Sequence, residues 1–379
     1  MNNKKNNTKN IFSKMKSPSN YPDSIILALE EYVFCVGLRK DGTTFHIEKR
    51  NIEEAAMSLK KALKKKNIIW LDYVVEGDFG SEVLKAAKLL GFSELLVKNL
   101  LKAKYGNYED FGSEMGVLLP AMHVEGFNVK INPLLVLIGK NLIVTMHSAE
   151  VIRFFRLRRY AAVLLRKFPH EMSDKDKITM LLIRIIDENN AKNFDYLRVI
   201  EEHGDKLSEK LVNPQTPRAL IGPEIHAMKH ALVTYLDGLW ATMDVLSALR
   251  YGDADLLTDD IKIIERINAL TAEVSAQIGL AEHMSEVLAS GLEVVQTIYN
   301  NQLQILNNRL ALVVTYLTIV GTAFLVPNTL ATILSNSAYN LTPNDAGWYT
   351  ALMLVSTVVA TLLAWWWVNK MGWLKNLPE

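Results

Sequence analysis

The sequence predicts an α/β domain followed by long α-helices and a two-span α-helical membrane hairpin that assembles with copies of itself as a parallel bundle. Three observations lead to this fold class. Strand-like and helix-like runs alternate over the first 148 residues, and helical periodicity continues from there almost to the end. Two uncharged apolar segments, 310–334 and 349–368, each have the length of ~20 residues that crosses a bilayer.

Composition limits the classes of function. The chain has 379 residues, 49% of them apolar, and a net charge of +1. One to three structural units are expected, and a general nucleic-acid binder is not, because such proteins carry a strong basic excess. A single cysteine, Cys35, excludes intramolecular disulfides and multi-cysteine metal sites, and we expect it to be a small buried residue. No phosphate-binding loop, dinucleotide fingerprint, zinc-protease motif or nucleophile elbow is present, so an enzyme is not expected.

Residues 1–21 are rich in Asn, Lys and Ser and contain no apolar run of signal-peptide length. They predict a disordered basic tail. Its lysines serve solubility or contact anionic lipid headgroups.

Residues 22–148 predict a compact cytoplasmic α/β domain. The helix-like runs are IEEAAMSLKKALKKK, SEVLKAAKLL and SELLVKNLLKA. The strand-like runs are SIILAL, YVFCVGL, TTFHIE, NIIWLDYVV, GVLLPAMHV, LLVLIGK and NLIVTMH.

Residues 149–256 predict a cytoplasmic helical region with helices over 149–168, 174–211 and 221–249. After a turn at 251–255, Thr258 is the expected N-cap of the next helix, with Asp259 and Asp260 at its positive end. No proline occurs from there to Pro327. Residues 257–309 therefore predict a stalk helix that continues into the membrane, roughly 100 Å in all, which is too long for a globule.

The two spans, 310–334 and 349–368, enclose an outer loop, 335–348, and a tail, 369–379, follows. The loop contains Asp345 and no Lys or Arg, whereas the long N-terminal part carries nearly all the lysines and arginines and the tail adds Lys370 and Lys375. Both termini are therefore expected in the cytoplasm of a multi-pass cell-membrane protein. Tryptophan and tyrosine gather at both span ends, as in interfacial belts, at Tyr339, Trp348, Tyr349, Trp365, Trp366, Trp367 and Trp373.

A mostly polar stripe follows one helical face through the stalk and the first span, with spacings of three and four residues that are typical of a bundle seam. Because a hydroxyl in hydrocarbon needs a partner or water, the stripe predicts a water-filled pore. The alternative is a polar seam that joins helices without conducting. The stripe consists of Asn301, Gln304, Asn308, Ala311, Thr315, Thr318, Thr322, Leu325, Thr329, Thr332 and Asn336.

The order of these parts resembles the CorA family of divalent-cation channels. The run 316–324, YLTIVGTAF, is similar to the family segment LTIIATIF, and Pro327 falls one residue later than the usual proline. Weaker similarities are the runs IWLD at 69–72, NYED at 107–110, NLIVTMH at 141–147 and KMGWL at 370–374. The resemblance implies a homo-oligomer, a pentamer in this family, that transports Mg²⁺ or another divalent cation.

One departure concerns the outer mouth. Family members carry Gly-Met-Asn at the outer end of the first span, and the corresponding positions hold Asn336, Ser337 and Ala338. Asn336 and Ser337 can still hydrogen-bond a hydration shell, and five copies of Asp345 would place a negative ring at the entrance. A turn cap is the other interpretation of Asp345. Leu325 or Val326 is the expected constriction.

The resemblance also implies regulation by divalent ions, for which Asp253, Asp255, Asp259 and Asp260 are candidates, as is the group Asp187, Glu188, Glu201 and Glu202. Solvated helix faces explain such charges as well. His226 and His230 lack an evident third ligand, and the arginines at 153, 156, 158 and 159 suit a salt-bridged helix better than a phosphate site. No other cofactor and no nucleic acid is expected, and the partners are membrane lipids and further copies of the chain. The alternatives are transport of zinc, cobalt or nickel, or a non-conducting membrane-anchored scaffold or sensor.

Overall fold

The computed structural model describes residues 32–47, 49, 51–212, 218–251, 254–335 and 342–370. The expected tail at 1–21 and the strand-like run SIILAL lie outside them. By internal contacts the chain divides into two units, one ending at Ala289 and one beginning at Ser290.

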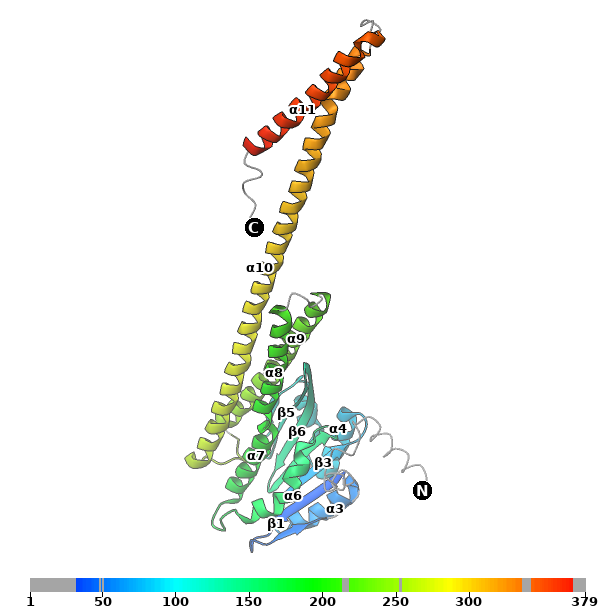
Figure 1. Cartoon of the computed structure of the whole chain (residues 1–379). Helices are drawn as coiled ribbons and strands as arrows, with labels where there is room; N and C mark the ends of the chain where they lie inside the picture. The colour runs from blue at the N-terminus through cyan, green and yellow to red at the C-terminus, as the bar shows by residue number, and fades with distance from the viewer. Residues whose placement is uncertain are drawn as a thin grey trace. The chain divides into compact units, whose positions relative to one another are not determined.

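The first unit is built on a seven-stranded sheet of order β2-β1-β3-β7-β6-β5-β4. Strands β1, β3, β5 and β6 are labelled in Figure 1. Neighbouring strands are antiparallel, except that β3 and β7 are parallel. Each strand-like run in the described part of the chain forms a strand, and β4 is an additional one. The strands are β1 Val33–Leu38, β2 Thr44–His46, β3 Ile68–Val75, β4 Asn107–Asp110, β5 Glu114–Glu125, β6 Asn128–Gly139 and β7 Leu142–Ser148.

Three helices pack on one face of this sheet, α3 (Ile52–Leu63), α4 (Phe79–Leu90) and α5 (Glu94–Leu100). Side chains alternate between the two faces of a strand, so Ile69, Leu71 and Val75 of β3 enter this core. Cys35 of β1 is buried in the same core, as expected.

Trp70, Asp72 and Val74 of β3 point to the opposite face, where α6 (Arg153–Arg166) and α7 (Asp174–Asn190) pack. The next helices, α8 (Asn193–Val212) and α9 (Arg218–Tyr251), both contact β5. The charged stretch expected as one helix is thus two, because α7 ends at Asn190 and α8 begins at Asn193.

Helix α10 runs from Ile261 to Leu334, 74 residues or about 110 Å. It includes the expected stalk from residue 261 onward and the whole expected first span. Its first turn is capped by Asp260, whose Oδ1 accepts from the Lys262 amide at 2.9 Å. The expectation that Thr258 is the N-cap is wrong, because its hydroxyl accepts from the Asp260 amide instead, at 3.1 Å.

The second unit contains the rest of α10, the short 3₁₀ helix η2 (Pro343–Asp345) and α11 (Ala346–Lys370). α10 continues through Pro327. In the described part of the chain, α10 and the stretch from Pro343 to Lys370 are long and apolar enough to cross a membrane, and few residues of their apolar stretches are buried in the single chain.

Candidate functional site

The threonines of the polar stripe donate their hydroxyl hydrogens to their own helix. Each hydroxyl bonds the carbonyl oxygen four residues earlier: Thr315 to Ala311, Thr318 to Val314, Thr329 to Leu325 and Thr332 to Asn328, all at 2.8 Å, and Thr322 to Thr318. The hydroxyl hydrogens therefore have a hydrogen-bond partner without water. The argument that these threonines need water to satisfy them no longer indicates a pore.

These bonds nevertheless fix the chemistry that the stripe presents. A hydroxyl whose hydrogen is held by a backbone carbonyl offers only its oxygen lone pairs to a neighbour, so it acts as an acceptor. Thr350, Thr357 and Thr361 of α11 make the same bond. The bond alone therefore does not distinguish one face of the hairpin from another.

Exposure does distinguish the faces of α10. Thr318, Thr322, Thr329 and Thr332 are exposed in the single chain, and Leu325 is 64% exposed. The half-buried and buried side chains lie mainly on a different face, more than about 100° further around the helix. They are Leu312, Ile319, Ala323, Pro327, Leu330, Ala331 and Leu334.

Thr315 lies between these two faces and is 9% exposed. Asn301, Gln304, Asn308 and Ala311, which continue the stripe toward the start of the helix, are exposed. Asn336 and Ser337, expected at the outer mouth, lie outside the described residues. Assignment of the stripe to a pore stays a prediction.

Asp345 makes a capping box at the start of η2. Its carboxylate accepts from the Thr342 amide at 2.8 Å, from the Thr342 hydroxyl at 2.7 Å and from the Trp348 indole at 3.0 Å. The turn-cap interpretation of Asp345 is therefore present in the structure. The residue is half-buried in the single chain, and a second role at a channel entrance stays a prediction.

The acidic candidates for regulation form no metal-binding group among the described residues. Asp255 and Asp259 are exposed, Asp260 caps α10, and Asp253 lies outside the described residues. Among the residues that the structure describes, no three His, Cys, Asp or Glu side chains are grouped closely enough to hold a metal ion. His226 and His230 are both exposed on α9.

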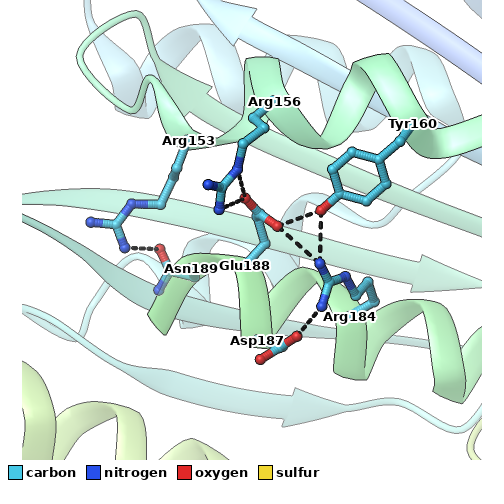
Figure 2. Close-up of polar contacts among 7 residues, drawn as sticks. All are labelled: Arg153, Arg156, Tyr160, Arg184, Asp187, Glu188 and Asn189. Atoms are coloured by element: carbon cyan, nitrogen blue, oxygen red, sulfur yellow. Dashed lines mark hydrogen bonds and ion pairs between the residues drawn. The ribbon is translucent and has the colours of Figure 1, made fainter. Parts of the chain in front are cut away.

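Glu188 is the centre of an ion network between α6 and α7 (Figure 2). Its buried carboxylate accepts from Arg156 Nε at 2.9 Å and Nη2 at 2.7 Å, from the Tyr160 hydroxyl, and from Arg184 Nη2 at 3.4 Å. Burial, and then the hydrogen bond to Glu188, raise the pKa of the Tyr160 hydroxyl. The salt-bridged interpretation of the α6 arginines is confirmed for Arg156, and for Arg158, which pairs with Asp72.

Comparisons with solved structures agree with this architecture. The complete CorA magnesium transporter from Methanocaldococcus jannaschii is 18% identical, with a TM-score of 0.61, over 89% of this chain and 98% of that one. The full-length CmaX protein is 17% identical, with a TM-score of 0.51, over 90% and 99%. The ZntB cytoplasmic domain from Vibrio parahaemolyticus RIMD 2210633 is 12% identical, with a TM-score of 0.51, over 72% and 99%. At these identities the likeness shows the shared fold.

None of the curated proteins compared with this chain matches it. The sequence model of the family described as "CorA-like Mg2+ transporter protein" matches residues 65–370, which is most of the chain and includes strands β3 to β7 and the two candidate spans. The protein is therefore a member of the CorA-like family of divalent-cation transporters.

Proposed function

We propose that copies of this chain assemble around α10 and conduct hydrated divalent cations, Mg²⁺ foremost, through a central pore. The observation that carries the proposal is the exposed stripe formed by Thr318, Thr322, Thr329 and Thr332, whose hydroxyls present acceptor oxygens on an exposed face of α10. The resemblance to the family suggests five subunits.

An acceptor surface suits this cargo. Mg²⁺ dehydrates reluctantly and keeps several waters, and those waters point their hydrogens outward. Neutral hydroxyl oxygens accept from such waters without the strong trapping that a carboxylate would cause. The span from 310 to 334 contains no charged side chain. Leu325, on the same face, supplies the apolar constriction that can close such a path.

We place both termini in the cytoplasm, because the outer loop has no basic residue. In an oligomer, copies of Asp345 would surround the entrance together with Asn336 and Ser337 and attract cations. Asp253, Asp255, Asp259 and Asp260 are the candidate regulatory ligands, and such a site would need acids from a neighbouring subunit.

Flux into proteoliposomes that contain a fluorescent Mg²⁺ indicator tests the proposal. Thr322→Leu and Thr329→Leu should each block flux, because leucine removes the acceptor and narrows the path. Thr350→Leu is the matched control, since it removes the same kind of hydroxyl, with the same backbone bond, from α11. Flux that persists in the α10 variants would contradict a pore along this face.

Two further measurements separate the alternatives. The mouth lacks the Gly-Met-Asn signature, so the transported ion has to be identified by measurement. Competition of zinc, cobalt or nickel with Mg²⁺ uptake ranks the transported ions. Absence of flux with every divalent ion would favour a membrane-anchored scaffold. The mass of the detergent-solubilised complex gives the subunit number.

A further inference from the structure

A cavity of about 290 Å³ lies in the first unit where β5, β6, the start of α6 and the start of α8 meet. Its wall is distant from the candidate pore residues in the sequence and belongs to the folded α/β unit. The side chains that give it chemical character are Arg153, Arg156, Arg159, Lys192, Tyr196 and Glu150.

The lining of this cavity is mainly cationic. Among the described residues it contains four cationic side chains and one carboxylate, Glu150, while Glu188, outside the lining, pairs with Arg156. Glu150 is also partly engaged, since its Oε2 accepts from the Asn132 amide at 3.3 Å. Lys192 is exposed and has no ion-pair partner within the described ranges. Like charges held together around a concave surface attract a multivalent anion strongly.

Two of the arginines, Arg153 and Arg156, are held in place by contacts with other residues of the protein. The buried Glu188 carboxylate binds Nε and Nη2 of Arg156, which leaves Nη1 of Arg156 as a donor (Figure 2). Arg153 donates to the Met122 carbonyl oxygen and, at 3.5 Å, to Asn189, and its guanidinium lies 5.7 Å from the centre of the Tyr196 ring. An anion that binds here meets donors that have already lost their conformational freedom, so little entropy remains to be lost.

The start of α6 adds to the positive potential. Val151, Ile152 and Arg153 line the cavity, and Ile152, at the N-cap position, makes no side-chain capping bond. The positive end of the helix dipole therefore faces the same space as the arginines. A guanidinium group can donate two parallel hydrogen bonds to two oxygens of one phosphate group, which a lysine ammonium group cannot do.

We propose that this cavity binds a small phosphorylated anion. Its volume is at the lower end of the range of ligand pockets, about 300–1,000 Å³, so inorganic phosphate or the phosphate group of a small metabolite fits better than a large cofactor. The ligand would connect α6, α8 and the β5–β6 hairpin, which are elements of one unit.

Isothermal titration calorimetry of the full-length protein in detergent, in phosphate-free buffer of low ionic strength, tests this inference. Inorganic phosphate is the first probe and glycerol 3-phosphate the second. The double variant Arg159→Gln, Lys192→Gln should weaken binding by about tenfold or more, because it removes two of the four positive charges that line the cavity. The control is Arg198→Gln with Lys206→Gln, which removes the same charges from exposed positions of α8 outside the cavity.

Glu150→Gln supplies an independent test, because it should change the binding affinity in the opposite direction. Removal of the only carboxylate of the wall should tighten binding several-fold, which a loss of folding cannot imitate. Tighter binding of glycerol 3-phosphate than of phosphate would identify a metabolite as the ligand, and equal or weaker binding would identify the free ion. Absence of binding of both probes, or equal binding by the wild type, the cavity variant and the control, would overturn the proposal.

Discussion

Arg158 of α6 and Asp72 of β3 form an ion pair inside the first unit. The Nε atom of Arg158 lies 2.6 Å from Oδ2 of Asp72, and the two side chains are only 4% and 0% exposed. His147 Nε2 lies 3.2 Å from the other carboxylate oxygen, and the Thr145 hydroxyl also donates to it. Helix α6 is thus joined to the sheet by a polar cluster as well as by apolar packing.

We predict that Arg158→Met destabilises the protein strongly. The substitution leaves the Asp72 carboxylate buried without its cation, which typically costs about 3–5 kcal/mol. The double variant Asp72→Asn, Arg158→Met should recover part of this loss, because no buried charge remains. Thermal unfolding of the full-length protein measures both, and equal midpoints for the single variant and the wild type would contradict the prediction.

The same pair predicts sensitivity to acid. Burial by itself would raise the pKa of Asp72, but the Arg158 guanidinium and His147 outweigh it and hold that pKa below its usual range. A lowered carboxyl pKa stabilises the fold fully above the unfolded value of about 3.9, and this contribution is lost as the pH falls below it. The thermal midpoint should therefore decrease as the pH is lowered below about 4. This decrease should be less steep in the Asp72→Asn, Arg158→Met variant. Parallel curves would show that other groups govern acid unfolding.

Cys35 should be unreactive in the folded protein. Burial raises the pKa of its thiol to about 12, and the thiolate is the reactive form. We expect a maleimide reagent to leave the native protein unlabelled at pH 8 and to label it once it is unfolded. Because the sequence has one cysteine, the extent of labelling reports unfolding directly. Rapid labelling under native conditions would contradict the burial of β1.

Much of the sheet could be predicted from the sequence because its strands are apolar runs bounded by turns. β4 could not, since Asn107–Asp110 is a short polar edge strand with no apolar alternation. The end of α7 near Ala191 was also missed, because neither proline nor glycine marks it.

The candidate pore could be predicted as a spacing of residues, but its hydrogen bonds could not. Sequence position does not show that a threonine donates to its own backbone or which side chains of α10 are exposed. The basic cavity was missed for a different reason. Arg153, Arg156 and Arg159 are near each other in the sequence, but Lys192 and Tyr196 reach the same wall only through the packing of α8.

Two glycines should respond oppositely to alanine. A Cβ at Gly106 would lie 2.7 Å from the Ala241 carbonyl oxygen of α9, so Gly106→Ala must shift backbone and should cost about 1–3 kcal/mol. A Cβ at Gly279 of α10 would meet no heavy atom within 4 Å apart from the adjacent backbone of its own helix, so Gly279→Ala should stabilise the helix by about 0.5–1 kcal/mol. Thermal midpoints that move in the same direction for both variants would show that the local packing is described incorrectly.

Thr322 provides the sharpest test of the pore chemistry, because valine and serine separate shape from hydrogen bonding. Thr322→Val keeps the volume and removes the acceptor, whereas Thr322→Ser keeps the acceptor. A hydrogen bond contributes about 0.5–1.5 kcal/mol. In the proposed oligomer, each subunit places one Thr322 at the pore, so the valine variant loses this hydrogen bond once per subunit. Mg²⁺ flux should therefore fall at least about fivefold in the valine variant. The serine variant should conduct like the wild type. If both conduct equally, the hydroxyl of Thr322 does not contact the hydration shell of the ion, and the conducting path lies on another face of α10.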